Sequence, residues 1–139
     1  MSPTNNKVIL RQAVPYFADT ANREQYFNLY ADDCVLHMPG LPPGLEGIKA
    51  FYQSFWAGFP DAQLTVADII AEADLVACRY ILRATHRGEF NGIPATGRAI
   101  QFEGITILRF DNGRCIERWN QADFLSLLQQ IGAMPIPAG

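Results

Sequence analysis

The sequence has few of the residues that build metal, nucleotide or covalent sites. It has two histidines, His37 and His86, and three cysteines that are spread along the chain without a C-x-x-C pair. It contains no H-E-x-x-H, G-x-G-x-x-G or G-x-S-x-G motif. These absences argue against a metal site, a bound nucleotide and an activated serine nucleophile. We therefore expect neither a metal nor any other cofactor.

Charge and long apolar runs are also scarce. Only 18% of the residues are charged, and the net charge of −3 makes nucleic acid a poor partner. No stretch approaches the roughly 18 uncharged residues that a membrane helix needs, and the N-terminus does not resemble a signal peptide. Separate cysteines suit buried free thiols in a reducing compartment. We expect a cytoplasmic protein that contacts neither membrane nor nucleic acid.

Apolar and aromatic residues are abundant instead. Hydrophobic residues make up 49% of the 139-residue chain and aromatic residues 12%, which predicts a single folded domain spanning residues 1–139. Residues 46–59 carry a helical stripe that is rich in aromatics: Ile48, Phe51, Tyr52, Phe55, Trp56 and Phe59. We expect this helix to pack its aromatic side against a sheet.

The second half of the chain predicts that sheet. Residues 99–110 and 114–122 are strand-like, and Asp111-Asn112-Gly113 between them suits a tight hairpin. In the first strand the even-numbered residues form the apolar face, whereas periodicity leaves the inward face of the second strand open. The other expected elements are helices at 2–17 and 23–30, strands at 34–38, 64–72 and 75–86, a loop at 39–44 and a final helix from Asp123. Strands do not alternate with helices, so we predict an α+β fold with a curved antiparallel sheet.

Several polar residues should lie at the rim or floor of the apolar space under this sheet. They are His37, Tyr80, His86, Thr106, Asn120 and Asp123. Such groups suit proton abstraction beside a carbonyl, with a carboxylate or imidazole as base and neutral donors that stabilise the enolate. Simpler roles remain open: His37 could anchor a loop, Tyr80 could belong to the core, and Asp123 directly precedes an apolar run and could only cap a helix. Trp56 and Phe90 are further candidates for substrate contact.

The motifs around these residues resemble the SnoaL-like polyketide (ester) cyclases. The similarity lies in residues 85–98, 109–114 and 117–123, in the Leu-Leu-Gln-Gln-Ile-Gly finish, and upstream in residues 46–48 and 59–61. The resemblance implies a cone-shaped α+β barrel of the nuclear transport factor 2-like (cystatin-like) type, whose mixed, mainly antiparallel sheet wraps around helices. It also implies a homodimer through the outer sheet face. Family members close a ring by intramolecular aldol condensation, without metal or cofactor, and use an aspartate as acid and base.

The chain departs from that family pattern at two positions. Asn120 stands where the family has its aspartate, and Thr106 stands where it has a pocket histidine. An amide cannot shuttle a proton, so Asp123 or His86 would have to act as base, with Asn120 and Thr106 as hydrogen-bond partners. The first hypothesis is thus a cofactor-free cyclase, lyase or isomerase acting on a hydrophobic carbonyl compound. The second is a non-catalytic binder of a small apolar molecule. An epoxide hydrolase with Arg118 and Asp123 is a third and weaker option.

Overall fold

The fold consists of three α-helices, two 3₁₀ helices and a five-stranded sheet within the described residues, which are 2–38 and 40–134 in this computed structural model. Pro39, which begins the predicted loop at 39–44, lies outside these residues. In chain order the elements are α1 (Pro3–Ala13), η1 (Val14–Phe17), η2 (Arg23–Leu29), β1 (Tyr30–His37), α2 (Gly44–Gly58), β2 (Gln63–Glu72), β3 (Leu75–Thr85), β4 (Ala99–Asp111), β5 (Arg114–Ala122) and α3 (Phe124–Gln130).

The sheet is mixed, with the strand order β1-β5-β4-β3-β2. The neighbours from β2 to β5 pair antiparallel, and the predicted hairpin joins β4 to β5. The mixed, mainly antiparallel sheet that the resemblance implied is confirmed. The antiparallel sheet expected from the order of elements is incomplete at one edge, because β1 pairs parallel with β5. Parallel neighbours need a long connection, and β1 is separated from β5 by a helix and three strands.

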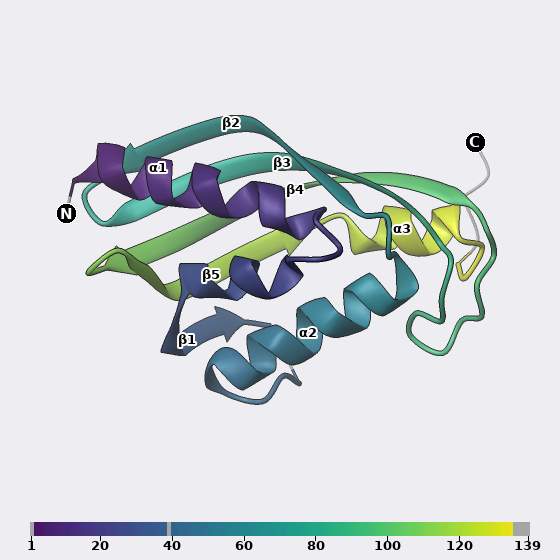
Figure 1. Ribbon diagram of the computed structural model, residues 1–139. Coiled ribbons are helices and arrows are strands. Elements are labelled where there is room, and N and C mark those ends of the chain that lie inside the picture. The colour runs from purple at the N-terminus through teal and green to yellow at the C-terminus, as the bar shows by residue number, and fades with distance from the viewer. Residues whose placement is uncertain (1, 39, 135–139) are drawn as a thin grey trace.

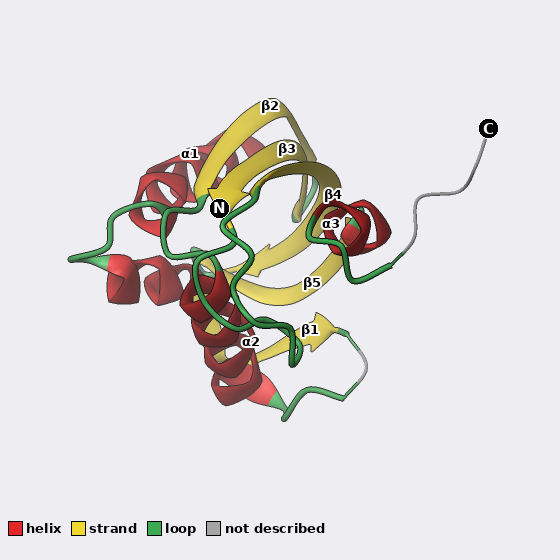
Figure 2. Cartoon of the chain, turned by 90° about the vertical axis from the view of Figure 1, so that its right-hand side faces the viewer, coloured by secondary structure: helices red, strands yellow, loops and turns green. Residues whose placement is uncertain are grey.

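The sheet curves strongly and partly encloses the helices. Figure 2 shows the arc from β2 through β3, β4 and β5 to β1, with α1 and α2 on its open side. In Figure 1, α1 runs along β2, whereas α3 lies at the opposite end of the molecule. The predicted α+β architecture is therefore confirmed. Its aromatic helix α2 buries Tyr52, Phe55 and Trp56 against the core, as the stripe predicted, while Phe51 is half-buried.

Two local features differ from the sequence-based prediction for the N-terminal region. The α-helix ends at Ala13, and Pro15 lies in the 3₁₀ helix η1, since proline lacks the N–H of a regular helix and crowds the preceding turn. The segment predicted as a short α-helix at 23–30 is the 3₁₀ helix η2, and β1 begins directly after it at Tyr30.

The two long strands of the hairpin place their side chains differently. In β4 the even-numbered residues are buried throughout, as predicted. The register between β4 and β5 shifts between Arg109 and Phe110, so Cys115 and Arg118 are both buried although one is odd and the other even. Such a bulge re-aims the side chains that follow it. Beyond it, Arg118 and Asn120 share the concave face, which decides the question that periodicity left open.

Candidate functional site

A cavity lies between the concave face of the sheet and the helices. About 390 Å³ of this space is not filled by protein atoms, and part of it is open to solvent. Apolar side chains form most of its wall: Phe17, Phe51, Phe55, Leu64, Leu82, Phe102 and Phe124. Its polar lining consists of Tyr26, Tyr52, Tyr80, Arg118 and Asn120. An apolar wall with a few convergent polar groups is the usual form of a small-molecule site.

Asn120 is held by Tyr80. The Tyr80 hydroxyl donates to Asn120 Oδ1 over 2.9 Å. The Tyr80 ring passes over Gly104, where the Cβ of any other residue would overlap it. Burial raises the pKa of Tyr80 to about 12, so the phenol stays neutral and remains a donor. Because Oδ1 is occupied, and Nδ2 has no acceptor among the described residues, Asn120 can offer an N–H donor to a ligand.

A second polar cluster surrounds Arg118. Its Nε donates to Thr106 Oγ1 at 2.8 Å, and Thr106 in turn donates to the Trp119 carbonyl. Its Nη1 donates to the hydroxyls of Tyr26 at 3.1 Å, Tyr30 at 2.5 Å and Tyr52. Burial alone would lower the pKa of Arg118. The nearby tyrosine oxygens outweigh this effect, and the pKa lies well above its ordinary value. The guanidinium is therefore charged at physiological pH.

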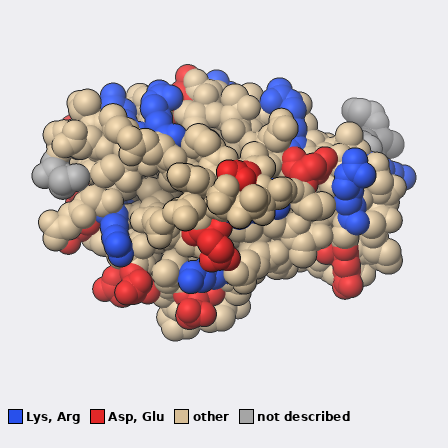
Figure 3. Space-filling view, viewed as in Figure 1, with Lys and Arg blue, Asp and Glu red and all other residues tan. Residues whose placement is uncertain are grey.

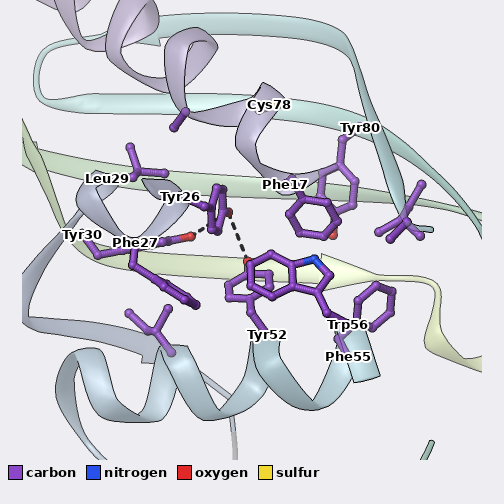
Figure 4. Close-up of a cluster of buried hydrophobic side chains, with 14 of the residues drawn as sticks. Phe17, Tyr26, Phe27, Leu29, Tyr30, Tyr52, Phe55, Trp56, Cys78 and Tyr80 are labelled. Atoms are coloured by element: carbon purple, nitrogen blue, oxygen red, sulfur yellow. Dashed lines mark hydrogen bonds between the residues drawn. The ribbon is translucent and has the colours of Figure 1, made fainter. Parts of the chain in front are cut away.

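The three tyrosine hydroxyls converge on one another as well. Figure 4 shows Tyr26 bonded to Tyr30 and to Tyr52, at 2.9 Å and 3.4 Å. Tyr52 accepts from Tyr26 and from Arg118, and its own hydrogen has no acceptor among the described residues. A hydroxyl has one hydrogen to donate. Since Tyr52 lines the cavity, it presents a donor there. Burial raises the pKa values of Tyr26 and Tyr30, so both stay neutral.

The structure does not bring His86 to the cavity lining. This side chain is fully buried and stacks on Phe59, with ring centroids 5.3 Å apart. Its Nδ1 lies 3.0 Å from Thr96 Oγ1 and accepts the Thr96 N–H, and its backbone bonds to Gly97 and Arg98. These contacts tie the segment that follows β3 to the end of α2. Its Nε2 is buried and has no partner among the described residues.

Asp123 also lies away from the cavity. It is exposed at the end of β5, and its carboxylate accepts the Ser126 N–H at 3.0 Å as the N-cap of α3. Arg118 bonds to tyrosines and Thr106, so the structure does not assemble the pair of Arg118 and Asp123 that an epoxide hydrolase would need. Asp123 therefore caps helix α3, and its carboxylate is not part of the cavity lining.

Of the remaining candidate residues, one lies on the surface and the others pack around or behind the cavity wall. His37 is exposed, bonds to Glu117 at 2.7 Å and stacks on Trp119. Trp56 is buried behind the cavity wall, and Phe90 packs against Phe55 and Phe59. Only two of the eight predicted site residues, Tyr80 and Asn120, line the cavity. Thr106 is buried behind Arg118 and orients it.

Sequence reasoning missed the roles of Tyr26 and Tyr52 and gave Arg118 only a minor one. The two tyrosines were hidden in helical stripes whose spacing is explained by core packing alone. Arg118 offered a better signal, since it precedes Asn120 by two residues and so shares its face of the strand. No group of three or more histidine, cysteine, aspartate or glutamate side chains in residues 2–38 and 40–134 is placed to hold a metal ion.

The fold and the cavity together define a cone-shaped α+β barrel of the nuclear transport factor 2-like class. The family model of the SnoaL-like polyketide cyclases matches residues 8–131. The chain belongs to this family, as its motifs suggested.

One curated relative and two solved structures show what the chain is similar to. The chain is 28% identical over 130 residues to the aklanonic acid methyl ester cyclase DnrD of Streptomyces peucetius, covering 84% of this chain and 90% of that protein. Among solved structures, the candidate polyketide cyclase IdmH from Streptomyces antibioticus is 34% identical, with a TM-score of 0.76 over 95% of this chain and 99% of that one. AclR from Streptomyces galilaeus, a candidate hydroxylase, is 27% identical, with a TM-score of 0.88 over 99% of this chain and 87% of that one.

Proposed function

We propose that this protein is a cofactor-free cyclase that closes a ring within a hydrophobic polyketide by an aldol-type reaction. The observation that carries the proposal is the Asn120 amide, which Tyr80 fixes at the polar end of an aromatic cavity. A fixed N–H donor aimed at a carbonyl oxygen stabilises the negative charge that develops there, and removing one such donor typically slows a reaction about 10²–10³-fold.

The reaction needs no external reagent. The substrate loses a proton from the carbon beside one carbonyl, and the resulting enolate carbon attacks a second carbonyl carbon of the same molecule. One carbon–carbon bond forms, the second carbonyl becomes an alkoxide, and this alkoxide takes up a proton. The product therefore has the same mass as the substrate. Asn120 Nδ2 would donate to the enolate oxygen, and the aromatic wall would hold the chain in its folded conformation.

The cavity also limits which substrates can react. Its lining, among the described residues, contains neither a carboxylate nor an imidazole. We therefore assign the proton-abstracting role to neither Asp123 nor His86, and propose that the substrate is acidic enough to lose its proton to water. A methylene group between two carbonyls meets this condition. Aklanonic acid methyl ester, which the relative DnrD is named for, is accordingly a suitable first compound to test.

We further propose that the protein works as a cytoplasmic homodimer. Its three cysteines are free and buried, which suits a reducing compartment. No helix within the described residues is long and apolar enough to cross a membrane. On the outer sheet face, Ile105 and Ile107 are exposed beside charged residues, and such apolar side chains favour a covered interface.

The direct test is to incubate the purified protein with aklanonic acid methyl ester and, in parallel, with the corresponding free acid, and to follow the product by chromatography and mass spectrometry. We expect a product of unchanged mass, formed faster than without protein and equally fast with a metal chelator present. A rate equal to that of the uncatalysed reaction, for the ester, for the free acid and for simpler β-keto esters with a tethered ketone, would overturn the proposal.

A further inference from the structure

Arg118 is a buried charge without a charged partner. Its residue is 7% exposed, and its printed contacts are to neutral oxygens of Thr106 and three tyrosines. By contrast, Arg79 and Arg109 on the outer face each pair with two acidic residues. No carboxylate within the described residues forms an ion pair with Arg118. A buried charge is strongly disfavoured unless it is paired, so this guanidinium favours an anion in the adjoining cavity.

The cavity gives such an anion access to Arg118. Arg118, Tyr26 and Tyr52 all line it, whereas Tyr30 and Thr106 hold the guanidinium from behind. The Tyr52 hydroxyl has its hydrogen free of any described acceptor and receives a hydrogen bond from the guanidinium, which makes it a stronger donor. An anion entering here would therefore meet a positive charge together with a polarised hydroxyl, both inside an apolar wall that strengthens electrostatic attraction.

We propose that the substrate carries a free carboxylate, which binds at Arg118 and Tyr52. This inference rests on the proposed function for the position of the reacting carbonyl at Asn120. Arg118 and Asn120 lie two residues apart on the same face of β5, with their Cα atoms about 6.6 Å apart along the strand. The cavity thus selects a polyketide acid over the corresponding methyl ester.

A matched pair of probes tests the charge preference without any need for turnover. Isothermal titration calorimetry at neutral pH would compare 2-naphthoate with methyl 2-naphthoate, which share the same ring system and differ in charge. We expect the wild-type protein to bind the acid at least tenfold more tightly than the ester. Equal binding of the two, tighter binding of the ester, or no binding of the acid at millimolar concentration would overturn the proposal.

Variants then locate the preference at Arg118. The Arg118→Met variant should lose it, with the affinity for the acid falling at least tenfold and that for the ester changing less than threefold. Tyr52→Phe should weaken binding of the acid severalfold while its ring still packs against Trp56. Arg83→Met is the control for net charge, because Arg83 lies exposed on the outer face, and this variant should retain the preference of the wild type.

Because Arg118 is buried, its variants could fail to fold, so the fold of each variant is checked by circular dichroism before titration. If Arg118→Met does not fold, Tyr52→Phe and Arg118→Lys decide the question, since the lysine keeps the charge and should retain part of the preference. An unchanged preference in Tyr52→Phe and in a folded Arg118→Met would place the anion elsewhere and overturn the proposal. Acid binding through Arg118 without ring closure would contradict only the cyclase function. Ring closure without preference for the acid would contradict only this inference.

Discussion

At the scale of single residues, Asn120 and Tyr80 act as one unit. Asn120 stands where the resemblance predicted an aspartate, and this exchange turns a proton acceptor into a neutral donor. Tyr80 completes the change, because its hydroxyl occupies Oδ1 and leaves Nδ2 for the ligand. The arrangement requires Tyr80 to stay protonated, and its raised pKa ensures this at physiological pH.

The raised pKa of Tyr80 makes a prediction for alkaline stability. The pKa of Tyr80 is about 12 in the folded protein and 10.0 in the unfolded chain. The contribution of Tyr80 to the free energy of unfolding is therefore fully present below pH 10 and is lost as the pH rises toward 12. At pH 11 the loss from this residue should be about 1.4 kcal/mol. Urea unfolding at pH 8 and pH 11 should show a smaller drop in Tyr80→Phe than in the wild type. Equal drops in the two proteins would contradict the account. The raised pKa values of Tyr26 and Tyr30 also lower the stability at alkaline pH, but these residues are present in both proteins and so do not affect the difference between them.

At the scale of secondary-structure elements, β4 makes room for the site. Gly104 lies opposite Tyr80 on β3, and an added Cβ would overlap the Tyr80 ring and hydroxyl. We expect Gly104→Ala to displace Tyr80, to lower the ring-closing rate about tenfold or more, and to destabilise the fold by about 1–3 kcal/mol. Kinetics and thermal unfolding measure the two effects. In a Tyr80→Phe background the same change should lower the rate much less. Full activity of Gly104→Ala would show that Tyr80 does not position Asn120.

The helix α3 gives a test of Asp123. As an N-cap, Asp123 should be replaceable by asparagine with little effect, whereas Asp123→Ala should lower the free energy of unfolding by about 1 kcal/mol. Chemical denaturation of the three proteins measures this. Ring closure at saturating substrate should be the same in all three, since the carboxylate lies outside the cavity. A large loss of activity in the well-folded Asp123→Asn protein would restore Asp123 as a catalytic residue.

The sequence predicted helices and strands better than it predicted the site, because secondary structure follows from local patterns and the site does not. The β4 strand, the hairpin and the aromatic stripe of α2 follow from local periodicity and turn chemistry, so they could be read directly. The orientation of β5 depends on its bulge against β4, which is set by pairing over a distance and left no local pattern. The cluster of Tyr26, Tyr52 and Arg118 joins three elements that are remote in sequence, and only the folded chain brings it together.

At the scale of the whole molecule, the outer sheet face predicts a dimer. Figure 3 shows side chains of both signs interspersed on the helix side of the molecule. On the outer sheet face, Ile105 and Ile107 lie 56% and 38% exposed among the cross-strand ion pairs. We expect sedimentation to find a dimer at micromolar concentration and Ile105→Lys to be a folded monomer, because the lysine would bury a charge at the interface. A monomeric wild-type protein under these conditions would contradict the proposed assembly.

The central claim is that a neutral Asn120 donor drives ring closure in the cavity, and the rate with two variants tests it most directly. Asn120→Leu removes the donor at similar size, and Asn120→Asp replaces it with a carboxylate that could accept a proton. We expect the leucine variant to close the ring about 10²-fold more slowly, with little change in KM. The aspartate variant should gain a rate that depends on the ionisation of its new carboxylate. Wild-type activity in a folded Asn120→Leu protein would contradict the account.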